Sequence, residues 1–273
     1  MGVFRSSPRI YEKLKDPRNI ADVLADMGVV YFETGDCDLA LGHLEKAFNL
    51  AEKIEYELVM ANVLNNLSII SAVQGCYDTA ILHSHDCLAR YGLLGDEYGS
   101  AQAYNNLGLI YLEKKDWQKT LDYLEKGLVI SQRIENYGLM ATIYINKADF
   151  NVRRTDFAAA SHFCQMASRL YYRIEDYRGL AETEKILGLI TASNGELRSA
   201  QRHLEIALDL TRNYGTFFGM AEVSRILGSV YRKRGFRQKA HSALRDSLHR
   251  YERLGAKYRT SKVKREMALL RKQ

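Results

Sequence analysis

The sequence repeats itself every 40 residues without a gap, and this repeat constrains the fold more than any other feature. Four positions of the repeat hold only small side chains. One of these columns is made of Ala21, Ala61, Ala101, Ala141, Ala181 and Ala221, and the other three start at Gly28, Ala40 and Ala47. Large apolar residues keep the same spacing, as in the column of Leu44, Leu124, Leu204 and Leu244. A register held over six copies predicts six units, at residues 21–60, 61–100, 101–140, 141–180, 181–220 and 221–260.

Each unit has the apolar spacing of two helices joined by a short turn. In the third unit, the first helix is expected at about residues 101–114, where Tyr104, Leu107, Gly108 and Tyr111 follow i, i+3, i+4, i+7 spacing. The second helix is expected at about residues 118–134. The turn between them falls at Lys115, where other units carry glycine, which suits a left-handed helix stop.

Composition supports an all-α fold. The chain has only two prolines, Pro8 and Pro17, whereas an all-β fold recruits proline and glycine into its many turns. No apolar run approaches the roughly 18 residues of a membrane span. The four cysteines form no disulfide framework, and no secretory signal precedes them, so we expect a cytoplasmic protein with reduced thiols.

One helical hairpin cannot bury its own apolar face, so the units are expected to stack into a solenoid. The small columns would then lie where helix backbones approach closely. Residues 1–20 are interpreted as the remnant of a preceding second helix that caps the first unit. Residues 261–273 are interpreted as a basic C-terminal capping helix, although a chain cut from a longer regulator would fit these ends equally well.

The pattern of residues 101–127, A-x-x-Y-x-N-L-G-x-x-Y followed by D-W-x-x-T-x-x-Y-L-x-x-G, resembles the tetratricopeptide repeat (TPR). The longer period is similar to the TPR variety of bacterial regulators, peptide-pheromone receptors and spindle or kinesin light-chain adaptors. The resemblance implies a right-handed superhelical solenoid and a non-enzymatic scaffold or adaptor that binds a protein or peptide. The alternative is the sensor portion of a bacterial-type signalling or transcription regulator.

The first-helix face that packing leaves free is rich in amide side chains. In TPR arrays this face lines the concave groove. Its candidate partner-binding residues are Asn62, Asn65, Asn66, Gln102, Asn105, Asn106 and Asn146, with Leu109 in an adjoining apolar stripe. An amide offers both a donor and an acceptor, so such a row suits the backbone of an extended peptide. The alternative is that these amides bond neighbouring helices to each other.

Basic residues gather near the C-terminal end. Residues 221–273 hold 16 basic and 4 acidic residues, against 23 and 29 in residues 1–220. The same helix face there carries Lys185, Arg225, Arg232, Lys233 and Arg265. We expect this basic end either to contact an acidic partner segment or another copy's acidic body, or to be a solvated cap. Nucleic acid is the least favoured partner, because no helix-turn-helix signature is present and the aromatic residues sit in packing columns.

No motif of a phosphate-binding loop, dinucleotide site, zinc protease or serine hydrolase is present, so no enzyme, cofactor or small-molecule substrate is implied. His43, His83 and His203 share one repeat position and are interpreted as packing or surface residues rather than metal ligands. The fourth unit departs from the pattern with Lys147, Asp149 and Asn151, which predicts either a soft seam or a polar contact point. The partner and the oligomeric state are left open.

Overall fold

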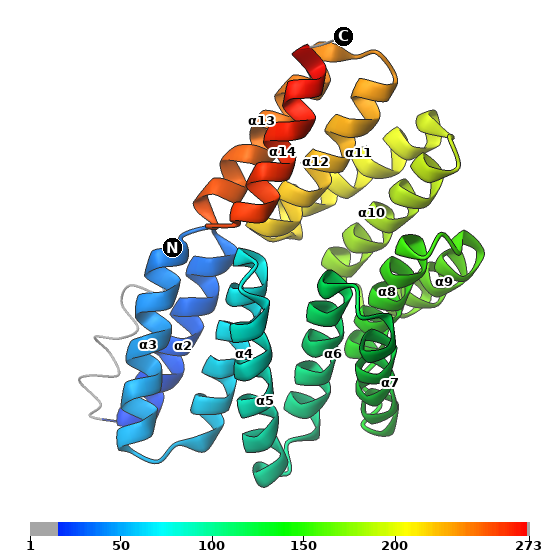
Figure 1. Ribbon diagram of the computed structural model, residues 1–273. Helices are drawn as coiled ribbons and strands as arrows, with labels where there is room; N and C mark the ends of the chain where they lie inside the picture. Colours follow the sequence, from blue (N-terminus) through cyan, green and yellow to red (C-terminus); the bar gives the residue numbers. More distant parts are fainter. Residues whose placement is uncertain (1–15, 272–273) are drawn as a thin grey trace.

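The computed structural model describes residues 16–271, and these residues form antiparallel helix pairs with no strand among them (Figure 1). The first helices of the pairs are α2 (Pro17–Glu33), α4 (Glu57–Gln74), α6 (Glu97–Lys114), α8 (Tyr137–Arg153), α10 (Tyr177–Ser193) and α12 (Phe217–Lys233). The second helices are α3 (Cys37–Lys53), α5 (Tyr77–Leu94), α7 (Trp117–Arg133), α9 (Phe157–Arg173), α11 (Leu197–Tyr214) and α13 (Arg237–Arg253). A last helix, α14 (Lys257–Arg271), packs on α13. The predicted all-α solenoid is confirmed.

Each first helix begins about four residues earlier than the predicted unit boundary. Capping side chains explain the difference for every first helix except α4: Asp96, for example, accepts a hydrogen bond from the Gly99 amide, and Asp176 accepts one from the Gly179 amide. A cap is polar and exposed, so apolar periodicity does not reveal it. Residues 17–20 therefore belong to α2 and residues 257–260 to α14. The remainder of the predicted N-terminal cap, residues 1–15, lies outside the described residues, as do residues 272–273.

The turns between helices recur every 20 residues, and all of them except the turn at Gly215 contain a residue with a left-handed backbone. Glycine takes this conformation at Gly35, Gly75, Gly95, Gly195, Gly235 and Gly255, and other residues take it at Glu55, Lys115, Glu135, Thr155 and Glu175. In each left-handed turn the amide of the next residue bonds back to a carbonyl five residues earlier, as Asp116 does to Tyr111 at 3.0 Å. This is the Schellman stop, and it confirms the turn expected at Lys115.

Two repeat columns noticed in the sequence pack against each other inside the units. Where the first helix carries glycine, the second carries leucine: a Cβ added at Gly108 would lie 2.7 Å from Leu124 Cδ2. The same glycine–leucine pairing occurs at residues 28 and 44, 188 and 204, and 228 and 244. In the second unit the pair is Ser68 and Ser84, whose hydroxyls bond at 2.6 Å. The combined volume of the two side chains is therefore conserved from unit to unit.

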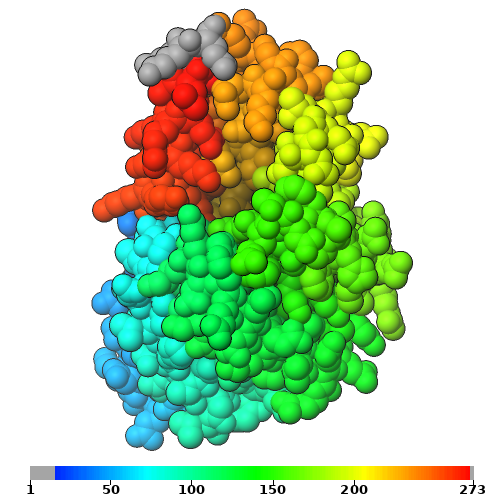
Figure 2. Space-filling model, turned by 45° about the vertical axis from the view of Figure 1, so that its right-hand side comes forward, coloured from blue at the N-terminus to red at the C-terminus, as the bar shows by residue number. Residues whose placement is uncertain are grey.

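The superhelix curls until helices far apart in sequence touch. The ring of Phe217, at the start of α12, lies against Gly35 at the end of α2. Arg178 pairs with Glu33 at 2.8 Å, and Arg253 pairs with Asp36. The C-terminal helices accordingly sit on the N-terminal ones (Figure 2). This curvature turns the concave side of the solenoid into a partly enclosed interior that stays open to solvent.

Candidate functional site

The concave side holds two adjoining cavities lined mainly by the first helices. The amide cavity, of about 600 Å³, is lined mostly by α2, α4 and α6 together with residues 136–142 and 176–178. The central cavity, of about 670 Å³, is lined by all six first helices and by Arg259 of α14. Both volumes are within the range of ligand sites in proteins. The two share a boundary at Asn66, Ile69, Asn106 and Thr142.

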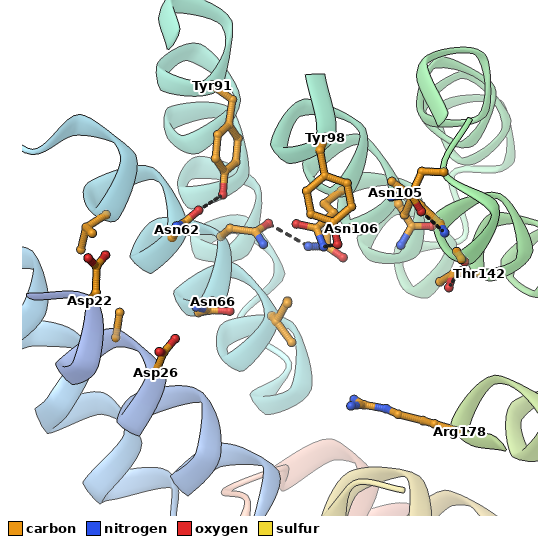
Figure 3. Close-up of a pocket in the computed structure, with 18 of the residues that line it drawn as sticks. Asp22, Asp26, Asn62, Asn66, Tyr91, Tyr98, Asn105, Asn106, Thr142 and Arg178 are labelled. Atoms are coloured by element: carbon orange, nitrogen blue, oxygen red, sulfur yellow. Dashed lines mark hydrogen bonds between the residues drawn. The ribbon is translucent and has the colours of Figure 1, made fainter. Parts of the chain in front are cut away.

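Most of the predicted amides line the amide cavity (Figure 3). These are Asn62, Asn65, Asn66, Gln102, Asn105 and Asn106, whereas Asn146 and Leu109 line the central cavity. The structure thus brings the predicted groove residues together on one continuous surface. Their contact with a partner stays a prediction.

The amides also join neighbouring first helices, which was the alternative interpretation. Asn106 Nδ2 donates to Asn65 Oδ1 at 2.8 Å, and Asn146 Nδ2 donates to Asn105 Oδ1 at 2.6 Å. Both bonds link residues 41 apart, and the ion pair of Arg225 with Glu266, at 2.9 Å, repeats that separation further along. Asn65 and Asn105 are 8% and 5% exposed, so these bonds replace water that the side chains have lost.

Other amides in the cavity keep hydrogen-bonding capacity. Tyr91 donates its hydroxyl to Asn62 Oδ1 at 2.8 Å, and Gln102 Nε2 donates to the Tyr98 hydroxyl at 2.8 Å. The half-buried Asn66 makes no side-chain hydrogen bond to any residue that the structure describes. Each of these groups can therefore turn a free lone pair or N–H toward a molecule in the cavity.

One wall of the amide cavity is acidic. Asp22 and Asp26 stand one turn apart on α2, and Arg178 enters from the opposite side (Figure 3). Burial raises the pKa of both carboxyls, and repulsion from Asp26 raises that of Asp22 further. Sequence reasoning missed Asp22, Asp26 and Arg178. Asp22 and Asp26 occupy groove positions of the first unit. The presence of acids at those positions was the signal that the sequence offered.

The central cavity combines an apolar lining with buried ion pairs. Lys185, 8% exposed, lies 2.5 Å from Glu182 and 2.8 Å from Glu222. Burial opposes the charge of each group, yet the two carboxylates raise the pKa of Lys185, while Lys185 lowers that of Glu222. Glu113 accepts from Arg153 at 2.8 Å and from Arg259 at 3.4 Å. These pairs link helices across the interior.

The five residues predicted to form a basic end do not form one surface. Lys185 and Arg225 are inside the central cavity and are neutralised by Glu222 and Glu266. Lys233 and Arg265 are exposed, and Arg232 is half-buried with its Nε atom unbonded within residues 16–271. The prediction placed Lys185 and Arg225 on a charged surface because sequence counts cannot show which acids face which bases.

Among the described residues, no cluster of three or more His, Cys, Asp or Glu side chains could hold a metal ion. His43 stacks on Tyr31 with ring centroids 5.1 Å apart, and His203 Nδ1 lies 2.7 Å from Glu184. Both histidines are therefore engaged in packing between the helices of a unit. Over residues 16–271, no helix is both long and apolar enough to cross a membrane.

Comparisons with known proteins agree with this architecture. Residues 59–133 match the tetratricopeptide repeat family. The Drosophila melanogaster Tonsoku-like protein is 22% identical over 218 residues, which cover 72% of this chain but only 16% of that protein. The chain therefore spans about a sixth of the length of this curated relative.

Two solved structures share the fold at low sequence identity. The apo form of RapI is similar with a TM-score of 0.70 and 14% identity, covering 93% of this chain and 90% of that one. A Rap protein complexed with Competence and Sporulation Factor is similar with a TM-score of 0.67 and 14% identity, covering 94% and 75%. The matched segment is a tetratricopeptide repeat, and the same 40-residue period and helix pairing continue through the rest of the described chain, as in the long variety of this repeat.

Proposed function

We propose that this protein is a non-catalytic scaffold or adaptor that binds a peptide segment of a partner on its concave side. The observation that carries this proposal is the amide cavity: a row of amides from neighbouring units faces a partly open cavity. When one primary amide donates to another, the accepting side chain keeps its NH2 group free and the donating side chain keeps its carbonyl oxygen free. Asn65 with Asn106 and Asn105 with Asn146 therefore offer two donor–acceptor sets one unit apart.

An extended peptide matches this arrangement because each residue of its backbone presents one donor and one acceptor. Neighbouring packed helices lie about 8–10 Å apart. Three extended residues span about 10 Å. Successive units would therefore grip the peptide about every third residue. The Rap structure solved with Competence and Sporulation Factor supports the same use of a similar fold.

The test uses purified protein and a display library of random peptides. Peptides selected on the native protein are measured against the double variant Asn66→Ala/Gln102→Ala. Because neither side chain joins two helices, folding should be unchanged. We expect a loss of affinity of up to about tenfold, as for one or two neutral hydrogen bonds.

The matched control is Gln238→Ala, which removes an exposed amide on α13, outside both cavities. Selected peptides that bind the double variant as tightly as the native protein would place their site elsewhere and contradict the proposal. A library that yields no binder to the native protein would contradict it as well.

The same groove supports the sensor alternative, in which the chain is the ligand-receiving part of a longer regulator. The observation in its favour is the central cavity, whose lining comes from all six first helices and would contact a ligand on several sides. A selected peptide that changes the radius of gyration in solution scattering would favour a sensor. A peptide that binds with no change of shape would favour an adaptor.

A further inference from the structure

The amide cavity lacks the positive charge that its acids require. Asp22 is half-buried and Asp26 is exposed, and neither forms an ion pair with a residue that the structure describes. Asp176 accepts the Gly179 amide as a helix cap, and Arg178, the basic residue of the lining, pairs with Glu33. Two carboxylates one turn apart therefore line the cavity without an ion-pair partner, and a cation placed between them would relieve their mutual repulsion and offset the partial burial of Asp22.

A second, independent feature is the unused donors of the buried amides. The Oδ1 atoms of Asn65 and Asn105 accept from the next unit, and their Nδ2 groups have no acceptor among the described residues. Both side chains are more than nine-tenths buried and line the amide cavity. A ligand that brings carbonyl or carboxylate oxygens as well as a cation would pair with both features. A polyamine would satisfy the acids but not these donors, whereas a peptide satisfies both.

The adjoining central cavity supplies a third requirement. Beyond the shared boundary its lining mixes charged groups with half-buried apolar side chains from four helices: Val29 and Phe32 of α2, Leu109 of α6, Leu189 of α10 and Phe218 of α12. The charged groups there are paired with each other. A bulky apolar side chain would bury its surface in this cavity without breaking an ion pair.

We propose that the occupant of the concave side is a peptide with a cationic group held between Asp22 and Asp26 and a bulky apolar side chain in the central cavity. Its backbone carbonyls accept from Asn65 and Asn105 between these two anchors. The cation is either the free amino terminus or a Lys or Arg side chain. This inference rests on the proposed function and adds the chemical class of the ligand and its direction. Nucleic acid does not fit, because its phosphates would meet the acidic wall.

The experiment measures binding of fluorescent hexapeptides from a positional-scanning library to the full chain. We expect enrichment of Lys or Arg at one position and of Leu, Ile, Phe or Met two to four residues away. In the variant Asp22→Asn/Asp26→Asn, cationic peptides should bind at least about tenfold more weakly. Peptides in which Lys is replaced by acetyl-lysine, or in which the amino terminus is acetylated, test the two sources of the cation separately. The modification that removes the bound cation should weaken binding to the native protein. The same modification should cause no further loss of affinity in the Asp22→Asn/Asp26→Asn variant.

The matched control is Glu45→Gln/Glu52→Gln, which removes two exposed carboxylates from α3 in the same unit, outside both cavities. It should leave every affinity unchanged. Replacing Leu109 by Asn should reduce the preference for Leu over Ala at the apolar position while leaving the cation preference intact.

The outcomes separate the two proposals. Library peptides that bind the concave side without preference for a cation, or bind the Asp22→Asn/Asp26→Asn variant equally well, would overturn the further inference and leave the proposed function standing. An absence of any peptide binding would overturn both. Equal losses in the acidic-wall variant and its α3 control would show a general charge effect and overturn the inference too.

Discussion

At the residue scale, two positions that contact each other across neighbouring units vary in side-chain size in opposite directions. Gly179 lies against the ring of Tyr171, and a Cβ at Gly99 would lie 2.5 Å from the ring of Tyr91. At the same positions of two other units the pairs are Ala51 with Val59 and Ser131 with Leu139. A large side chain on one helix is thus matched by a small one on the next. Both tyrosine hydroxyls reach the concave side, where Tyr171 bonds Thr142 and Tyr91 bonds Asn62.

Gly179→Ala should therefore destabilise the protein by about 1–3 kcal/mol, because the new methyl group overpacks a buried ring. Gly179→Leu should cost more, and adding Tyr171→Ser should recover much of that loss, since the double variant copies the Ser131 and Leu139 pair. Urea unfolding followed by circular dichroism measures the three free energies. Additive losses in the double variant would show that the two side chains do not share one space.

At the element scale, a left-handed residue ends every helix from α2 to α13 except α11, which ends at the extended Gly215. Glycine adopts this conformation without strain, whereas a β-branched residue such as Thr155 pays a steric cost there, with φ at 61°. The polar α8 that precedes this turn has partners for its unusual side chains. Lys147 pairs with Glu125 at 2.6 Å, and Asn151 donates to the Lys147 carbonyl at 2.7 Å. Faster exchange of α8 amides, the mark of a soft seam, stays a prediction.

Thr155→Gly should stabilise the protein by about 1 kcal/mol, because it removes the left-handed strain of a residue with a Cβ atom. The reverse change, Gly195→Thr, should destabilise it by a similar amount. A Cβ at Gly195 would meet nothing within 4 Å, so strain alone acts there. Chemical denaturation of both variants tests the pair. Two changes of the same sign would show that contacts, not backbone conformation, dominate at these turns.

At the scale of the whole molecule, a few contacts close the superhelix. Besides Arg178 with Glu33 and Arg253 with Asp36, Arg259 of α14 reaches the Val73 carbonyl of α4 at 3.4 Å. Exposed ion pairs are individually weak and are screened by salt. The closure should therefore be the least stable contact of the solenoid, and it surrounds the central cavity.

Reversing the charges with Arg178→Glu/Arg253→Glu should open the superhelix and increase the radius of gyration measured by small-angle X-ray scattering. High salt should move the native protein in the same direction. Arg90→Glu is the control, because it breaks an ion pair with Glu57 inside the second unit and leaves the closure intact. An unchanged radius in the double variant would mean that packing at Phe217 and Gly35 holds the ends together without the charges.

The sequence by itself determined the repeat, the two helices of each unit, the glycine stops and the small columns at helix crossings. These features are local or strictly periodic, so the same residue pattern can be seen in each of the six units. It also placed the amides on one face, since helical spacing decides which residues share a face. Helix starts were displaced because caps such as Asp96 carry no apolar signal.

Only the tertiary structure decided what the groove residues touch. The curvature of the superhelix sums small rotations between units, and no single unit encodes where Arg178 meets Glu33. For the same reason, charge counts could not show that Lys185 lies between two acids, nor that Asp22 and Asp26 face the cavity without a partner within the described chain. Pairing between charges is set by three-dimensional proximity, which depends on the stacking of all six units.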